Sequence, residues 1–207
     1  MDKNAARIRQ AALRLFADRE TPDIGVAELA RASGVARGTV YSHVASPGSL
    51  FSQLATELAV ELTAEVQALS RQLADPAERV ALGIRFFVQR AHDDNAVGRF
   101  LGRHGASTPS LRVIWAGPPL ADVLDGVASG RFAVSPAAAP QAVASMAATV
   151  LAAMLLVTEG HAGWRPAAHD AVEFVLRGLG LTPAEAARVA DCAASHDATS
   201  AAGTGGR

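Results

Sequence analysis

The chain has 207 residues, of which 50% are apolar and 5% aromatic, and its formal net charge is −1. This charge argues against a uniformly basic, histone-like DNA binder, while abundant alanine and scarce aromatics favour packed helices over strands. Cys192 is the only cysteine, which excludes an intrachain disulfide and a cysteine-based zinc cage. We therefore expect an all-α protein, large enough for a small domain joined to a larger one.

The N-terminal quarter is expected to hold three short helices. Apolar residues recur at helical spacing from Ile8 to Phe16, and Gly34 interrupts a second stretch of the same kind. The predicted short helices cover residues 4–18, 26–33 and 37–43.

Longer helices are expected in the rest of the chain. Ser46-Pro47 and Asp75-Pro76 each pair a capping residue with a first-turn proline. Thr182 to Glu185 has the capping-box pattern, and the Gly-, Ser- and Pro-containing stretch 105–110 is expected to be a loop. The predicted longer helices run from 47 to about 72, from 76 to about 91, over 96–103, around 120–127, from 136 to about 160, around 172–179 and from 183 to about 194.

These patterns predict a DNA-binding domain over residues 1–52, a helical ligand-binding and dimerisation domain over 53–195, and a disordered tail over 196–207. The first of these carries a net charge of +2 and the remainder −3, the direction expected if the first part meets nucleic acid. The N-terminus lacks the pattern of a secretory signal. The apolar stretch 142–157 is shorter than a membrane span needs, so we expect a cytoplasmic protein with no membrane contact.

The most informative segment is 26–44, with the sequence VAELARASGVARGTVYSHV. Two short helices can dock there because Leu29 and Ala30 face inward, Gly34 takes the turn, and valines close a small core. The outward face of the second helix then carries hydrogen-bond donors, an aromatic ring and a glycine, which suit contact with phosphates and base edges. These candidate DNA-binding residues are Arg37, Gly38, Thr39, Tyr41, Ser42 and His43.

Over about residues 5–55 the chain resembles the tetracycline-repressor (TetR) family of regulators. The matching residues are Leu29-Ala30, Gly34-Val35, Gly38-Thr39-Val40-Tyr41, His43-Val44 and Ser46 with Leu50-Phe51. The resemblance implies that Arg37 and Gly38 lie near the bases, and that Thr39, Tyr41 and His43 hold the phosphate backbone.

Four positions depart from the family pattern. Ile24 stands where a capping threonine that touches phosphate is common, so Asp23 is expected to cap the second helix instead. Pro47 replaces a lysine, Gly48 replaces an acid, and Val44 replaces a larger aromatic residue. We therefore expect fewer phosphate contacts than is usual in the family, and a shallower dependence of DNA affinity on salt.

The larger domain contains aromatic, methionine and arginine residues in its middle helices. The resemblance implies a ligand cavity among those helices, and a lining of rings and methionine favours a small apolar or aromatic ligand. The alternative is that most of these residues form the core. Arg90 lies beside the inward stripe, where it would meet an anionic group. The candidate pocket residues are Phe87, Arg90, Phe100, Arg103, Trp115, Met146 and Met154.

The alanine-rich helix around 142–157 and the helix around 172–179 are the candidates for a homodimer interface. A helix that is apolar nearly all round must be covered on both sides, and the resemblance implies a homodimer. A two-fold dimer of this kind places its recognition helices about 34–36 Å apart.

The sequence therefore predicts a DNA-binding transcriptional regulator, acting as a ligand-released homodimeric repressor on a double-stranded operator. One alternative is a helical interaction protein of the same fold with weak or lost DNA binding, which Ile24 and Pro47 would favour. An enzyme is disfavoured, because no nucleophile elbow, P-loop or dinucleotide fingerprint is present. No metal site is expected, since the adjacent His92, Asp93 and Asp94 cannot face one ion from a helix, and no cofactor is expected.

Overall fold

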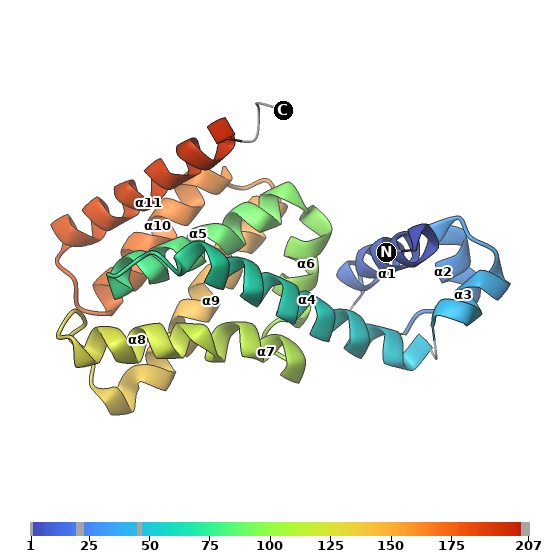
Figure 1. Cartoon of the computed structure of the whole chain (residues 1–207), viewed down its shortest axis with the longest axis horizontal. Coiled ribbons are helices and arrows are strands. Elements are labelled where there is room, and N and C mark those ends of the chain that lie inside the picture. Colours follow the sequence, from blue (N-terminus) through green and yellow to red (C-terminus); the bar gives the residue numbers. More distant parts are fainter. Residues whose placement is uncertain (1, 20–22, 45–46, 204–207) are drawn as a thin grey trace.

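The computed structural model describes residues 2–19, 23–44 and 47–203, and these residues form helices and connecting turns with no strand. Figure 1 shows three short helices gathered at one end of the molecule and a larger helical bundle at the other, with the long helix α4 running between them. The short helices are α1 (Lys3–Ala17), α2 (Val26–Ser33) and α3 (Arg37–His43), and α4 spans Pro47–Ser70. The predicted all-α fold is confirmed for the residues that the structure describes.

The larger domain is built around α5, which packs against α4, α6, α8, α9, α10 and α11. Its apolar stripe, from Val80 through Ile84 and Phe87 to Ala91, is buried among these neighbours. The remaining elements are α5 (Pro76–Asp93), α6 (Asn95–His104), α7 (Pro109–Ala116), α8 (Pro118–Ala128), the 3-10 turn η1 (Pro136–Ala138), α9 (Ala139–Thr158), α10 (Trp164–Gly178) and α11 (Pro183–Gly203).

Two of the predicted helix starts have the expected hydrogen bonds. The Asp75 carboxylate accepts from the Ala77 N–H at 2.9 Å, and Thr182 and Glu185 form a reciprocal capping box, each accepting from the other's N–H at 3.3 Å. The predicted cap at Ser46 lies outside the described residues.

Three local expectations differ from the structure. Helix α7 begins at Pro109, inside the stretch expected to be a loop, because a proline in the first turn is favourable and three later residues of the helix are buried on one face. Helix α11 continues to Gly203 through part of the segment expected to be disordered, which is rich in helix-favouring alanine. Asp23 does not cap α2, since Gly25 is its N-cap and no side chain caps it.

Candidate nucleic-acid interface and internal pocket

The α2–turn–α3 unit has the geometry that the sequence predicts for a helix-turn-helix. Leu29, Ala30 and Val40 are buried, and Gly34 ends α2 in the left-handed region at φ 64°, which only glycine adopts without strain. The Gly34 carbonyl accepts a hydrogen bond from Arg7 Nη2 at 2.9 Å. A Cβ at position 34 would lie 2.6 Å from that nitrogen, so a larger residue would displace the Arg7 side chain in addition to straining the backbone.

The outward face of α3 is open to solvent. Arg37, Gly38 and Ser42 are exposed and Thr39 is half-buried. Tyr41 is 68% exposed, so most of its side chain faces solvent. This face therefore presents its donors and its ring outward, as a nucleic-acid interface requires.

His43, the last residue of α3, is held by an acid that the sequence reasoning missed. Its Nε2 lies 2.6 Å from the Asp2 carboxylate, and its Nδ1 lies 2.8 Å from the Thr39 carbonyl. The Asp2 contact, followed by the Thr39 contact, raises the pKa of His43, and the hydrogen bonds from His43 and the Asn4 N–H lower the pKa of Asp2. Asp2 caps α1, so only the packing of α1 beside α3 brings it to this surface.

Other positions around α3 explain one departure from the family pattern and supply positive charge. Ile24 is 2% exposed, so it fills the small core at a position where a phosphate-binding threonine is common. Lys3, Arg31 and Arg37 are exposed and form no ion pair with any residue that the structure describes. These three cations are available to a phosphate backbone.

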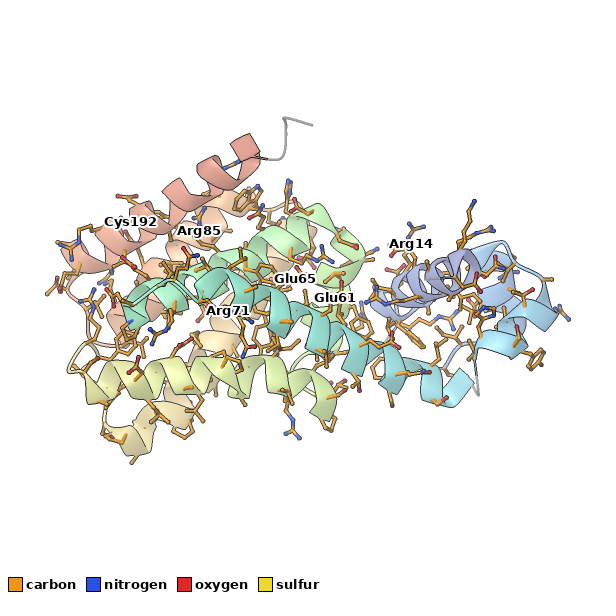
Figure 2. All side chains as sticks on the ribbon, in the orientation of Figure 1. Arg14, Glu61, Glu65, Arg71, Arg85 and Cys192 are labelled. Atoms are coloured by element: carbon orange, nitrogen blue, oxygen red, sulfur yellow. The ribbon has the colours of Figure 1, made fainter. Side chains whose placement is uncertain are left out.

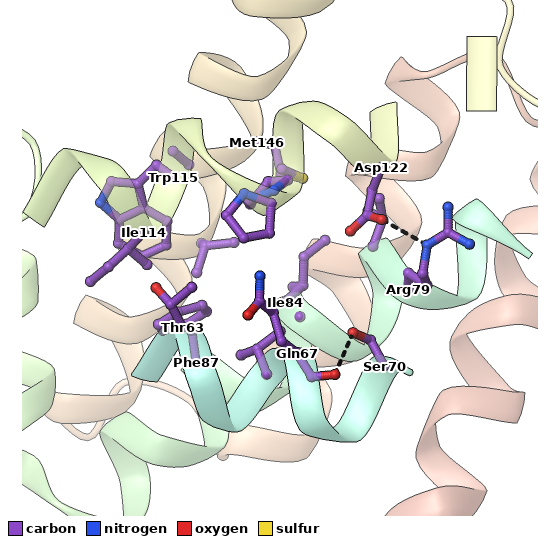
Figure 3. A pocket seen from close by; sticks show the side chains of 17 residues that line it. Thr63, Gln67, Ser70, Arg79, Ile84, Phe87, Ile114, Trp115, Asp122 and Met146 are labelled. Carbon is purple, nitrogen blue, oxygen red and sulfur yellow. Dashed lines mark hydrogen bonds and ion pairs between the residues drawn. The ribbon is translucent and has the colours of Figure 1, made fainter. Parts of the chain in front are cut away.

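The larger domain contains a pocket of about 60 Å³ between α4, α5, α7, α8 and α9. Figure 3 shows the rings of Phe87 and Trp115 at one end of it and Asp122 with Arg79 at the other. Of the seven predicted pocket residues, Phe87, Trp115 and Met146 line this pocket.

The other four predicted pocket residues lie elsewhere. Phe100 and Met154 are fully buried core residues, and the Phe100 ring packs against Phe51 at 5.6 Å between centroids. Arg90 pairs with Glu61 at 3.7 Å and Arg103 is exposed. Their residue types gave no means to tell the pocket from the core, because helical period alone places both kinds of residue inward.

Polar groups that the sequence reasoning missed also line the pocket. Thr63 Oγ1 is buried and makes no hydrogen bond with the described residues, which costs about 1–3 kcal/mol for a hydroxyl taken from water. Asp122 Oδ1 accepts from Arg79 Nε at 2.7 Å, and Arg79 also binds Asp125 and the Leu73 and Ala74 carbonyls. Burial raises the pKa of Asp122, although the Arg79 contact opposes this.

Polar contacts connect the pocket with the small domain. The Trp115 indole N–H donates to the Gly105 carbonyl at 3.2 Å. The preceding residue, His104, is buried, and its Nε2 donates to the Phe16 carbonyl near the end of α1 at 3.0 Å. The Phe51 ring lies 5.2 Å from the Phe16 ring and 5.0 Å from the His104 ring.

Charged contacts cross the same junction. Glu61, labelled on α4 in Figure 2, accepts from Arg9 of α1 at 2.5 Å and pairs with Arg90 of α5. Arg99 of α6 pairs with Asp18, which follows α1, at 2.8 Å. Helix α1 is therefore bound both to α4 and to α6, so a movement of α6 relative to α4 would change the contacts that hold α1.

Both parts of the chain match known protein families. Residues 8–54 match the family described as bacterial regulatory proteins, tetR family. Residues 75–192, more than half of the chain, match the tetracyclin repressor-like, C-terminal domain. An uncharacterized HTH-type transcriptional regulator of Mycobacterium tuberculosis (strain H37Rv) is 31% identical over 93 residues, which are 45% of this chain and 46% of that protein. The chain thus spans about half the length of this curated relative.

Solved structures with the same fold cover nearly the whole chain. The resorcinol complex of RolR is 25% identical, with a TM-score of 0.67 over 91% of this chain and 93% of RolR. The fatty acid degradation regulator FadR from Bacillus halodurans is 14% identical, with a TM-score of 0.73 over 88% of this chain and 99% of FadR. The first of these has a small-molecule ligand, and the second supports the fold. This chain belongs to the TetR family of transcriptional regulators.

Proposed function

We propose that this regulator represses transcription by binding a double-stranded operator as a homodimer, and that a small molecule in the internal pocket releases it. The observation that supports DNA binding is the outward face of α3, where hydrogen-bond donors, the Tyr41 ring and the Arg37 side chain are exposed to solvent. Arg37 and Gly38 are assigned to base edges, and Thr39, Tyr41, Ser42 and His43 to the phosphate backbone. A cytoplasmic location follows from the need to reach DNA.

The test is a band-shift or fluorescence-anisotropy titration with the DNA upstream of the protein's own gene. Arg37→Ala is expected to weaken binding by about ten- to a hundredfold, since a base contact contributes about 1–3 kcal/mol. Tyr41→Ala is expected to weaken binding to all DNA sequences alike, through the loss of a phosphate contact. The dimer, measured by sedimentation, is expected to stay intact in both variants. Undiminished binding in both variants would contradict the assignment of the α3 face.

We assign the homodimer interface to α9 and α10, the helices that contain the predicted segments 142–157 and 172–179. The stretch 136–158 is long and apolar enough to cross a membrane, with a mean hydropathy of 1.8, yet only 28% of its most apolar part is buried within the chain. Leu155 and Leu156 of α9 are 48% and 45% exposed, and Phe174 of α10 is 69% exposed. In a soluble DNA-binding protein, a second copy is the cover that this apolar face requires.

Release by a ligand follows from linkage, because a ligand that binds the non-DNA state more tightly must weaken DNA binding. The hydrogen bonds from Trp115 to Gly105 and from His104 to Phe16 support this assignment. They join a pocket-lining ring to the end of α6, and the end of α6 to α1. The resorcinol bound to RolR provides further support for a small-molecule ligand.

A further inference from the structure

We propose that the pocket selects a neutral, single-ring aromatic molecule bearing hydroxyl groups, and that Thr63 and Asp122 are the residues that recognise those hydroxyls. This inference rests on the proposed ligand-binding role of the pocket and specifies its chemistry.

The pocket is smaller than a single aromatic ring requires, so a ring must widen it on binding. A cavity of about 150 Å³ is enough for benzene, and this pocket holds about 60 Å³. It widens for a ring without a change of fold, because the Met146 side chain is unbranched and adaptable and Gln67 is exposed.

The walls favour a flat apolar body. The Phe87 and Trp115 rings lie 5.0 Å apart between centroids at an angle of 49°, and both line the pocket together with Ile84 and Met146. Aromatic side chains in such offset arrangements accept a further ring by stacking or edge contact. The body of the ligand is therefore aromatic.

Thr63 supplies the first polar contact. Its Oγ1 is buried and makes no hydrogen bond with the described residues, whereas other described threonine hydroxyls on helices, such as those of Thr56 and Thr149, bond the carbonyl four residues back. A buried hydroxyl without a partner is uncommon. Thr63 lines both the pocket and a shallower groove between α4 and α7, so a ligand that enters by this groove meets the hydroxyl on its way in.

Asp122 supplies the second contact, at the far end of the pocket from Thr63 (Figure 3). One of its oxygens accepts from Arg79, and the other points away from Arg79 toward the interior of the pocket in the same view. A carboxylate oxygen accepts hydrogen bonds only, so it favours a ligand that donates one. A ring with hydroxyls at two separated positions meets both Thr63 and Asp122.

The charges in the pocket disfavour an anion. Arg79 is the only cation among the residues that line it. Its guanidinium is already bound by Asp122, Asp125 and two backbone carbonyls. No cation is left to offset the desolvation of a ligand carboxylate or phosphate. Neutral hydroxyls are the polar groups that the pocket accommodates.

The test is isothermal titration calorimetry of the full-length protein without DNA, at neutral pH, against resorcinol, phenol, anisole, toluene, benzoate and benzylamine. Resorcinol is expected to bind most tightly and phenol next. Anisole and toluene, which lack a hydroxyl donor, are expected to be weaker than phenol by about tenfold, the effect of one hydrogen bond. Tighter binding of toluene, benzoate or benzylamine than of the hydroxylated rings would overturn the proposal.

Two variants and a control identify the residues involved. Thr63→Val keeps the shape of the side chain and breaks no internal hydrogen bond, so the variant is expected to fold normally, to lose about tenfold in resorcinol affinity and to keep its toluene affinity. Gly83→Val fills part of the pocket, where the nearest atom to a new Cβ is a Val66 methyl at 3.9 Å, and is expected to weaken every ring ligand. Thr56→Val alters an exposed threonine in the groove between α4 and α7. This variant is expected to change neither the resorcinol affinity nor the toluene affinity. An equal loss for toluene and resorcinol in Thr63→Val would refute the role of its hydroxyl.

The calorimetric result does not depend on DNA binding, so the two proposals fail separately. Failure of all six ligands, with operator binding intact in the wild-type protein, would overturn the ligand class and leave the DNA-binding role standing. Tight resorcinol binding by a protein that fails to bind the operator would support the ligand class and overturn the DNA-binding role.

Discussion

The two ends of this molecule form their functional surfaces in different ways. The candidate DNA-binding surface lies mostly on α3, a helix of seven residues, and most of its residues are neighbours in sequence. The pocket draws its lining from five helices between Thr63 and Val150. A surface formed by neighbouring residues can be recognised in the sequence as a motif. A surface assembled from distant helices appears in the sequence only as scattered inward-facing residues.

The largest effect on operator affinity is expected from a variant that breaks the dimer, because DNA binding at one end of the molecule requires the dimer formed at the other end. Phe174→Glu places a charge on the exposed apolar face of α10 in each copy, and like charges that meet across an interface cost several kcal/mol. We expect a monomer by sedimentation and at least about a hundredfold loss of operator affinity. Leu69→Glu is the matched control, since Leu69 is an exposed leucine of α4. A dimeric Phe174→Glu protein would contradict the interface assignment.

The next largest effect is expected in the turn between α2 and α3. Gly34→Val puts a β-branched residue at φ 64° and a Cβ 2.6 Å from Arg7 Nη2, so we expect about 1–3 kcal/mol of destabilisation and loss of operator binding with the dimer retained. Chemical denaturation and anisotropy are the measurements. Gly160→Val is the control, because Gly160 has φ 76° but nothing within 4 Å of a Cβ. If both variants lose the same stability, the contact with Arg7 has no part in the effect.

A smaller effect is expected in the coupling between the two ends. His104→Phe keeps a ring against Phe51 and Phe100 but removes the donor to the Phe16 carbonyl. Resorcinol affinity is expected to be unchanged by calorimetry, while the factor by which saturating resorcinol weakens operator binding falls about tenfold, a typical coupling of 1–3 kcal/mol. His92→Phe, at an exposed position of α5, is the control. Full release of DNA from the His104→Phe variant would show that this hydrogen bond does not transmit the signal.

The smallest effect is expected from the acid at the edge of the DNA-binding surface. Since Asp2 raises the pKa of His43, the pair contributes most to stability below the ordinary histidine pKa of about 6.5, and that contribution is lost as the pH rises through the raised value. Asp2→Asn keeps a good helix cap, frees His43 Nε2 and removes a negative charge. We expect operator affinity at pH 6 to rise roughly two- to fivefold and to fall more steeply toward pH 8 than in the wild-type protein. Unchanged affinity at both pH values would mean that His43 does not reach a phosphate.

The predictions from sequence succeeded where a local pattern has one structural solution. The bounds of α2 and α3 agree with the prediction, because Gly34 forces the turn between two apolar faces. Helix α7 was missed, since its eight residues lie beside a stretch rich in turn-forming residues. In the pocket, Phe87, Trp115 and Met146 were found by residue type, while Thr63 and Asp122 were not, because a polar residue on an amphipathic helix is normally expected to face water.

By itself, the sequence determined the helical class, the helix-turn-helix and the family, since each depends on residues a few positions apart whose spacing sets which side chains share a face. Only the tertiary structure decided which inward residues line a pocket and which form the core, that Asp2 meets His43, and that His104 bonds α1. These facts depend on the docking of helices far apart in the chain, and the periodicity of a single helix carries no information about what lies opposite it.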